Sequence, residues 1–329
     1  MPTQKQLLAA AARDGKRIAK MKVAPFSSNL ILPQGVKEEP VVEDVFKPKT
    51  FEEYVGQEQV KDIVQIMVQA ENNESRPIPS MLISGSYGQG KTTLAELILD
   101  GTHFIETTGT VVNNNPHLGG YVLIDEIHNL RPDICDVLNP QMDSGRLSII
   151  GCTTNPGLLS GPFRSRFRVL SLAPYTVEDL TNIQYNAINR KGTITAQYEL
   201  LTEISERSRF TPRQALQYLS FVMDLMSVRG EGVLTRETLH DAFDKLGVDN
   251  LGLTAIDHKY LAALPDDRPV GLQMISAKIG VDQDTIEQDI EPYLLQMGLI
   301  DRSTKGRFKI ASLEQQFEQA LDEVFKNRE

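Results

Sequence analysis

A glycine-rich loop that ends in a lysine is the first feature of this sequence that could do chemistry. The run Gly85–Thr92 fits the pattern of glycine, four residues, glycine, lysine, then serine or threonine. Such a loop wraps backbone N–H groups around a phosphate, and it needs glycines because a Cβ atom would hold the backbone away. Lys91 would reach the outer phosphates of a nucleotide and the Thr92 hydroxyl would bind Mg²⁺. The predicted phosphate-binding residues are Gly85, Gly88, Gly90, Lys91, Thr92 and Thr93.

Two adjacent acidic residues, Asp125 and Glu126, follow the apolar run 121–124. They would lie at the carboxyl end of a buried strand, where open α/β sheets bind their ligands. Asp125 would hold Mg²⁺ through its water shell, and Glu126 would polarise the attacking water. Taken alone, the pair could equally be a helix cap. Its place after the glycine-rich loop favours phosphoryl transfer to water.

Two further polar segments could serve the same reaction. Thr154 follows the apolar run 147–150 by a few residues and could meet the γ-phosphate or the water, although a plain turn would also explain it. Arg164 and Arg166 flank Ser165. Arginine suits a phosphate because its charge is fixed and its donors are forked. These arginines could serve the nucleotide of a neighbouring subunit, and the alternative is an exposed turn with salt bridges.

Arg213 follows Pro212 at the expected start of a helix. A cation there meets the unfavourable end of the helix dipole. A nearby anion such as ATP would account for it, and a surface salt bridge is the alternative. We therefore include Arg213 in the candidate ATP site.

Three cations crowd a short loop near the C-terminus, between the apolar runs 299–300 and 308–310. Two short apolar runs around a glycine-containing loop predict a hairpin. Cations at such a tip are typical of a wing that contacts DNA phosphates, and a solvated hairpin tip is the alternative. The candidate DNA-binding residues are Arg302, Lys305 and Arg307.

Strand and helix patterns alternate in the part of the chain that carries the glycine-rich loop. This alternation predicts a parallel sheet covered on both faces. The strand pattern stops near residue 176, and helical patterns follow. We expect four parts: a basic N-terminal arm and linker at 1–44, a nucleotide-binding domain at 45–175, a helical lid at 176–252, and a DNA-binding domain with a terminal helix at 253–329.

Composition sets further limits on the 329-residue chain. The net charge of −10 argues against a wholly basic DNA binder but allows local basic patches. Cys135 and Cys152 predict buried thiols, since they lack metal-ligand spacing. We expect a cytoplasmic protein with no membrane segment. The basic arm is interpreted as a solvated tail in preference to a DNA or partner contact.

With these residues placed, the chain resembles the AAA+ ATPases, and among them the RuvB family of Holliday-junction branch-migration motors. The resemblance implies an α/β P-loop sheet with a helical lid, followed by a C-terminal winged-helix domain. In the ATPase part the similar segments are Lys47–Gln57, Asp125–His128, Gly151–Thr154 with Gly157–Leu159, Arg164–Phe167 and Thr211–Arg213. In the DNA-binding part they are Arg268–Leu272, Asp284–Glu287, Glu291–Gly298 and Arg302–Arg307.

The resemblance also implies roles for single residues. Phe46 and Lys47 would lie on the adenine side, and Tyr175 would line the nucleotide site. Thr154 would be the sensor 1 residue. Arg166, with Arg164 second, would be the arginine finger acting on a neighbouring subunit. Arg213 would be sensor 2, and Arg302 and Arg307 would contact DNA.

The implied function is an ATP- and Mg²⁺-dependent motor that moves along double-stranded DNA or migrates Holliday junctions as a hexameric ring. Two departures matter. The stretch between Thr93 and Tyr121 is shorter than expected for the family, and the second departure is more telling. The family carries a long hairpin between Walker B and sensor 1 that docks RuvA, whereas this chain has only Asn129–Arg146 there. That speaks against RuvA docking in the family's manner. It also favours the alternative function, an ATP-switched loader that places another protein on DNA.

Overall fold

The computed structural model describes residues 46–310 except 75, 193 and 266–267. The expected basic arm and the expected terminal helix at 312–326 lie outside this range. Two compact units make up the described chain: the first runs to Lys191 and includes Thr211–Arg213, and the second holds Gly192–Phe210 and the residues from Gln214 onward. None of the described helices is long and apolar enough to cross a membrane.

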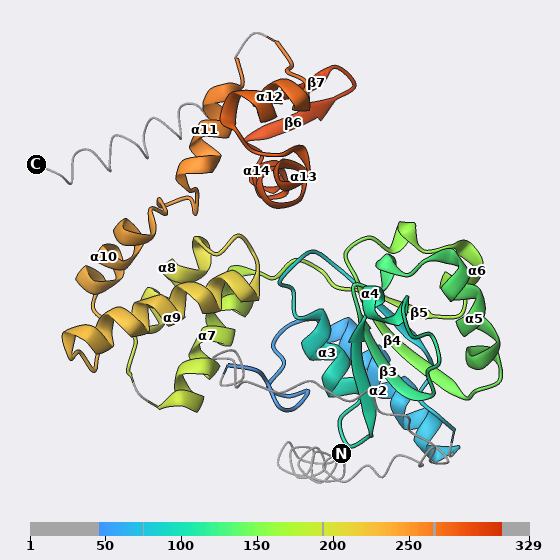
Figure 1. The fold of residues 1–329 in the computed structure, drawn as a ribbon. Coiled ribbons are helices and arrows are strands. Elements are labelled where there is room, and N and C mark those ends of the chain that lie inside the picture. The colour runs from blue at the N-terminus through green and yellow to red at the C-terminus, as the bar shows by residue number, and fades with distance from the viewer. Residues whose placement is uncertain (1–45, 75, 193, 266–267, 311–329) are drawn as a thin grey trace, which may run out of the picture. The chain divides into compact units, whose positions relative to one another are not determined.

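Five parallel strands form the sheet of the first unit, in the order β2-β3-β4-β1-β5 (Figure 1). The three interior strands are apolar runs buried on both faces, as the sequence predicts for a parallel sheet. The strands are β1 (Met81–Ser84), β2 (Phe104–Thr108), β3 (Gly120–Asp125), β4 (Leu147–Thr153) and β5 (Arg168–Ser171).

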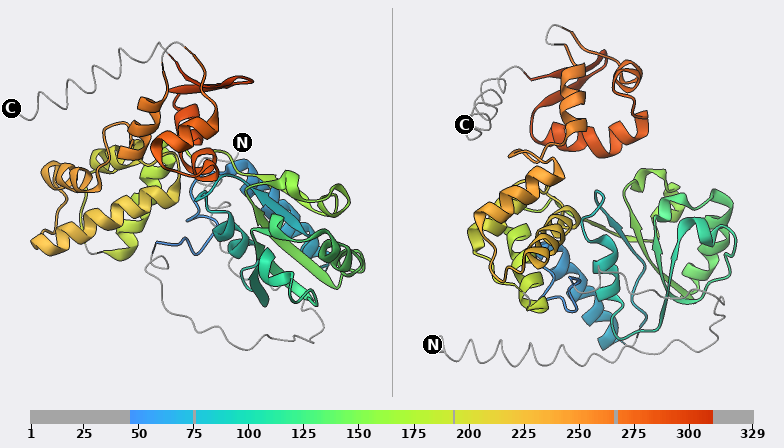
Figure 2. Two further views of the ribbon diagram at one scale, coloured as in Figure 1. Left: turned by 45° about the horizontal axis from the view of Figure 1, so that its top comes forward. Right: turned by 60° about the vertical axis from the view of Figure 1, so that its left-hand side comes forward.

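Helices cover both faces of this sheet (Figure 2). Residues such as Met81 and Ile83 face one core and Leu82 faces the other, because successive strand residues point to opposite faces. The first core is covered by α2 (Glu58–Asn73) and α3 (Lys91–Ile98). The second is covered by α4 (Gly109–Val112), α5 (Pro132–Asp143) and α6 (Gly161–Arg164). Helix α7 (Val177–Lys191) ends the main run of this unit.

The second unit begins with three further helices, α8 (Tyr198–Glu206), α9 (Pro212–Arg229) and α10 (Arg236–Leu246). The first residues of α9 are grouped with the first unit. Helix α10 starts where the Thr235 side chain accepts the Thr238 N–H, and it ends at Gly247, whose φ of 65° suits glycine.

A separate apolar core follows, centred on Tyr260, Ile275 and Leu294. It joins short helices to an antiparallel hairpin, and Val270 pairs with Arg307 as a third strand position. The elements are α11 (Ala255–Ala263), α12 (Leu272–Ile279), α13 (Gln283–Thr285), the π-helical turn η4 (Ile286–Ile290), α14 (Glu291–Gln296), β6 (Ile300–Ser303) and β7 (Gly306–Lys309). The hairpin expected at 299–310 is confirmed.

Candidate functional site

The glycine-rich loop joins β1 to α3, as its pattern predicts. Gly88 has a φ of 72° and Gly90 a φ of 77°, a region that side chains with a Cβ rarely adopt. A Cβ on Gly90 would lie 3.2 Å from the Tyr54 hydroxyl oxygen, and one on Gly88 would lie 3.0 Å from the Arg213 Cβ. Both glycines are therefore required by backbone conformation and by close neighbours.

Lys91 directs its ammonium group into this loop. Its Nζ donates to the carbonyl oxygens of Gly85 at 3.0 Å and Ser86 at 2.8 Å. Burial lowers the pKa of Lys91, and nearby Cys152, Glu126 and Asp125 oppose that shift. A buried cation beside two carboxylates, within a cradle of backbone groups, is suited to a polyphosphate.

Thr92 and Asp125 meet where the first turn of α3 passes the carboxyl end of β3. The Thr92 hydroxyl donates to the Asp125 Oδ2 atom at 3.3 Å, and the other Asp125 oxygen accepts the Glu126 N–H at 2.9 Å. Hydroxyl and carboxylate oxygens are the ligands that Mg²⁺ prefers. The two residues predicted to bind the metal are thus brought together.

Glu126 follows β3 with an unusual backbone. Its φ of 48° and ψ of 45° are left-handed, which is costly for a residue with a Cβ. Its carbonyl oxygen packs so closely on Gly109 that a Cβ there would approach it to 2.6 Å. The Glu126 side chain is partly exposed and lies near enough to Lys91 to act on the pKa of that lysine.

His128 is a site residue to which sequence reasoning gave no role. Its Nδ1 lies 3.3 Å from the Glu126 Oε2 atom and 3.0 Å from the Thr153 Oγ1 atom. Thr153 Oγ1 also accepts the Asn155 N–H, whereas the buried Thr154 Oγ1 has no hydrogen-bond partner among the described residues. Of these two hydroxyls, that of Thr154, the predicted sensor, is therefore the one without a partner in the described part of the chain.

Two tyrosines are linked to the loop by a chain of hydrogen bonds. The Tyr175 hydroxyl donates to the Tyr54 hydroxyl at 3.2 Å, which donates to the Gly90 carbonyl at 3.3 Å. Burial raises the pKa of Tyr175 to about 12, so it stays neutral at ordinary pH. Tyr175 thus reaches the loop through Tyr54, which the sequence did not single out.

Three further residues were predicted to contact the nucleotide: Phe46, Lys47 and Arg213. Phe46 is buried and its carbonyl accepts Arg190, while Lys47 pairs with Glu96 of α3 at 2.5 Å. The Arg213 side chain is exposed, and its backbone N–H donates to the Gly88 carbonyl at 3.3 Å.

Arg166 lies near the amino ends of the strands, opposite the carboxyl ends where the phosphate loop begins. Strand β5 begins two residues later at Arg168, which pairs with Met81 at the amino end of β1, whereas the loop follows the carboxyl end. The Arg166 guanidinium forms two hydrogen bonds of 2.8 Å with Asp143 and lowers the pKa of that carboxyl. Arg164 donates to the Pro156 carbonyl at 3.4 Å. Arg166 is therefore not brought to the loop of its own subunit.

The hairpin cations differ in their surroundings. Arg307 is only 15% exposed and contacts Glu287 at 2.5 Å and Glu291 at 2.9 Å. Arg302 is 40% exposed and also pairs with Glu291, whose carboxylate is fully buried and accepts the Tyr260 hydroxyl at 2.7 Å. For Lys305 at the tip, no ion pair is found within the described chain. The hairpin thus combines one anchoring cation with two more exposed ones.

Comparison with known proteins identifies relatives over most of the chain. Three family models match in order: the Holliday junction DNA helicase RuvB P-loop domain at 46–150, the RuvB AAA lid domain at 175–249 and the RuvB C-terminal winged helix domain at 250–312. The Holliday junction branch migration complex subunit RuvB of Campylobacter lari is 36% identical, covering 82% of this chain and 90% of that protein.

Solved structures agree with this similarity. The Thermotoga maritima RuvB Holliday junction branch migration motor has a TM-score of 0.75 at 30% identity, covering 83% of this chain and 98% of that one. A single-residue variant of the same protein gives a TM-score of 0.76 over the same shares. The similarity therefore spans the ATPase core, the lid and the hairpin domain.

Proposed function

Because this chain belongs to the RuvB family, we propose that it is an ATPase that drives branch migration of Holliday junctions or translocation on double-stranded DNA. The observation that carries the proposal is the joint placement of Lys91, Thr92, Asp125 and Glu126 around one loop. The match to the RuvB winged helix model does not favour the loader alternative.

The residues of the site fit ATP and Mg²⁺. When bound, ATP would supply the phosphoryl group that is transferred to water, and Mg²⁺ would neutralise the charge on the phosphates. Lys91 and the loop N–H groups would hold the phosphates, and Thr92 and Asp125 would hold the metal. Glu126 would orient the water and take up its proton. The unpartnered Thr154 hydroxyl supports a contact of that residue with a ligand.

Arg166 would complete the site of a neighbouring subunit. Its position near the amino ends of the strands supports action in trans, because a strand length of about 10 Å separates these ends from the carboxyl ends beside the loop. A ring, a hexamer by family resemblance, is the arrangement in which every subunit both donates and receives such a finger.

The hairpin would contact DNA. Its exposed cations, Lys305 and Arg302, would bind backbone phosphates, and Arg307 would do so from an anchored position. Only residues 144–146 separate α5 from β4, so no long hairpin is available there for RuvA. We propose that the protein works without RuvA docked in that way.

The decisive experiment is branch migration of a synthetic four-way junction by the purified full-length protein with ATP and Mg²⁺. We expect movement without a partner and no stimulation by added RuvA. ATP hydrolysis without any movement of the junction would contradict the motor function, and absence of hydrolysis would contradict the ATPase itself.

A further inference from the structure

The segment Arg207–Arg213 is where the chain passes between its two units. Residues up to Phe210 are grouped with the second unit, Thr211–Arg213 with the first, and the chain from Gln214 onward with the second again. Four peptide bonds therefore join Arg209 to Arg213, and each end of this short piece is held by a different unit.

The far end of the segment contacts the phosphate loop. The Arg213 N–H donates to the Gly88 carbonyl at 3.3 Å. The approach is tight, since a Cβ on Gly88 would come within 3.0 Å of the Arg213 side chain. A rearrangement of the loop at Gly88 would displace this backbone directly.

The near end contacts the winged helix domain. The Arg209 guanidinium pairs with Asp257 at the start of α11 and donates through Nε to the Gly252 carbonyl at 3.3 Å. It also lies over the Tyr293 ring, 5.1 Å from the ring centre, and the neighbouring Phe210 ring is 6.0 Å from that of Tyr293.

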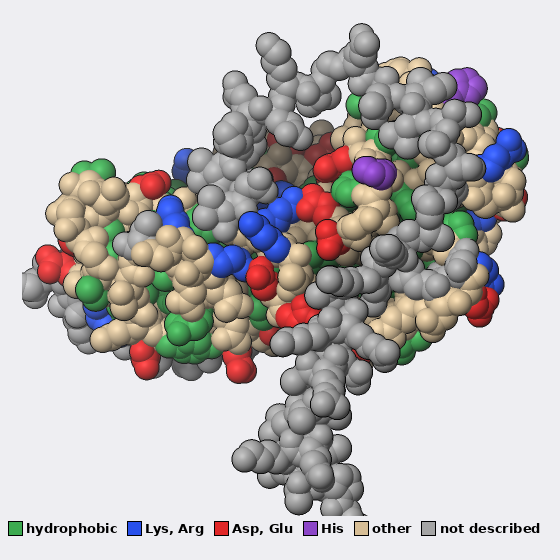
Figure 3. All heavy atoms as spheres, turned by 90° about the horizontal axis from the view of Figure 1, so that it is seen from below, with side chains coloured by type: hydrophobic (Ala, Val, Ile, Leu, Met, Phe, Trp, Pro, Cys, Tyr) green, Lys and Arg blue, Asp and Glu red, His purple; other side chains and the backbone are tan. Residues whose placement is uncertain are grey.

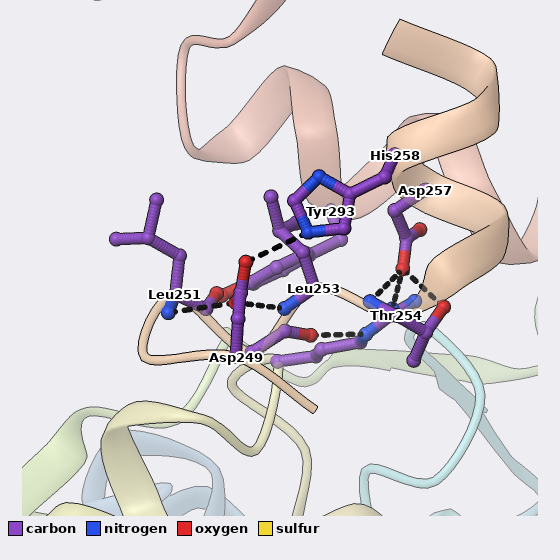
Figure 4. A network of polar contacts seen from close by, with 9 residues as sticks. Asp249, Leu251, Leu253, Thr254, Asp257, His258 and Tyr293 are labelled. Atoms are coloured by element: carbon purple, nitrogen blue, oxygen red, sulfur yellow. Dashed lines mark hydrogen bonds and ion pairs between the residues drawn. The ribbon is translucent and has the colours of Figure 1, made fainter. Parts of the chain in front are cut away.

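Asp257 makes the Arg209 contact more than a surface ion pair. Its side chain is fully buried, and Arg209 is the cation with which it pairs in the described chain. The same Asp257 oxygen accepts the Thr254 N–H and hydroxyl at 2.7 and 2.6 Å and so caps α11 (Figure 4). A buried carboxylate that loses its cation is strongly penalised, so this contact is hard to break.

The backbone between the two ends is strained. Arg209 has a φ of 51° and Phe210 a φ of 55°, two consecutive left-handed residues that both carry a Cβ. Such conformations persist only where the surroundings hold them, and they concentrate at switch regions. Here Asp257, Gly252 and Tyr293 of the winged helix domain provide the hold.

From these contacts we propose that Arg209 is a positioning residue that couples the winged helix domain to the phosphate loop. The nucleotide state at Gly88 is passed through the backbone of Arg213 and the strained pair to Arg209, and from there to Asp257 at the start of α11. The inference rests on the proposed ATPase function, because it requires that the loop responds to a nucleotide.

Hydrogen exchange of the full-length protein, with and without a non-hydrolysable ATP analogue and Mg²⁺, tests the coupling. In the unmodified protein we expect altered protection at residues 85–92 and at 249–258. In Arg209→Met the response of 85–92 should remain, whereas that of 249–258 should fall by about fivefold. Because the single variant leaves Asp257 unpaired, the double variant Arg209→Met with Asp257→Asn is measured as well.

Arg236→Ala is the matched control, since Arg236 forms an exposed pair with Glu203 in the lid. It should change neither response. The coupling is overturned if residues 85–92 of the unmodified protein respond while 249–258 do not. It is also overturned if 249–258 respond fully in both Arg209 variants. In either case ATP binding stands. If 85–92 itself shows no response, the proposed ATPase function fails and the inference fails with it.

Discussion

Glu126 and His128 form a unit whose parts are visible only in three dimensions. The pattern of two acids after an apolar run predicted a site role for Glu126, because such a run places them at the carboxyl end of a strand. Nothing in the pattern predicted its left-handed backbone or its contact with His128, since both depend on Gly109 and Thr153 from other elements. His128 links Glu126 to β4, the strand that leads to the predicted sensor.

Glu126→Gln tests the predicted catalytic residue. The amide keeps the size of the side chain but cannot take up a proton, so we expect kcat for ATP hydrolysis to fall by roughly 10²–10⁴ with little change in ATP affinity. Steady-state hydrolysis and equilibrium binding of a fluorescent ATP analogue check the two halves. Turnover at the normal rate would remove Glu126 from this role.

His128→Asn tests whether the imidazole orients Glu126. We expect kcat to fall by about tenfold with KM unchanged, because Glu126 remains but is less well placed. His240, which pairs with Glu203 on the lid surface, offers a matched control, and His240→Asn should leave kcat unaltered. Equal losses in both variants would point to a general effect of histidine removal.

Arg166 can be tested by mixing subunits. Arg166→Ala lacks the proposed finger and Lys91→Ala lacks the proposed phosphate ligand, so each should be nearly inactive alone. In an equal mixture about one interface in four combines the intact halves, and hydrolysis should recover to roughly that share. Recovery at no mixing ratio would argue against a site shared between subunits.

Interior strands were predictable and edge strands were not. The runs of β1, β3 and β4 are almost entirely buried and therefore mostly apolar, which is a strong strand signal in a sequence. Strand β2 carries Glu106 and two threonines and is only partly buried, and in β5 only Leu170 is buried. Such edge strands depend on the neighbour they pair with, and single-sequence patterns carry little trace of them.

The three cations of the hairpin differ in their roles, and this difference can be tested. Arg307→Ala should lower the free energy of unfolding by about 2 kcal/mol, since Glu291 is buried and keeps only Arg302 as a cation. Lys305→Ala should leave stability unchanged and reduce the salt dependence of DNA binding by about one counterion. Denaturant titration and binding at several salt concentrations separate the two. Equal stability of both variants would contradict the anchoring role.

At the scale of the whole molecule, charge is mixed, since 34 lysines and arginines stand against 44 aspartates and glutamates. Both kinds of side chain are visible on the face drawn in Figure 3. With a net charge of −10, attraction to DNA must come from local groups such as the hairpin cations and not from the general field. The total charge alone therefore gives no sign of a DNA-binding function, whereas the cations at 302–307 predict one.

The contact between His258 and Asp249, at the junction of α10 and α11, should make stability weakly dependent on pH. A hydrogen bond from His258 to Asp249 raises the pKa of the imidazole, with burial opposing and Asp257 adding to the effect (Figure 4). Because the folded pKa is raised, the stabilisation is full below about pH 6.5 and is lost as the pH rises through the folded value.

The pair is partly exposed, so its contribution should stay below about 1 kcal/mol. Urea unfolding at pH 6 and pH 8.5 should therefore show a small loss of stability at the higher pH. His258→Gln should remove the part of this loss that is due to the pair. An unaltered pH dependence in that variant would show that other groups cause it.

The separation of Arg166 from its own phosphate loop has a consequence for dilution. If Arg166 completes the site of a neighbouring subunit, as proposed, a monomer holds no complete site and gains one only by contact with another copy. Specific activity should then rise with protein concentration and collapse on dilution through the dissociation constant of that contact. The number of active motors in a cell would then rise more steeply than the concentration of the protein.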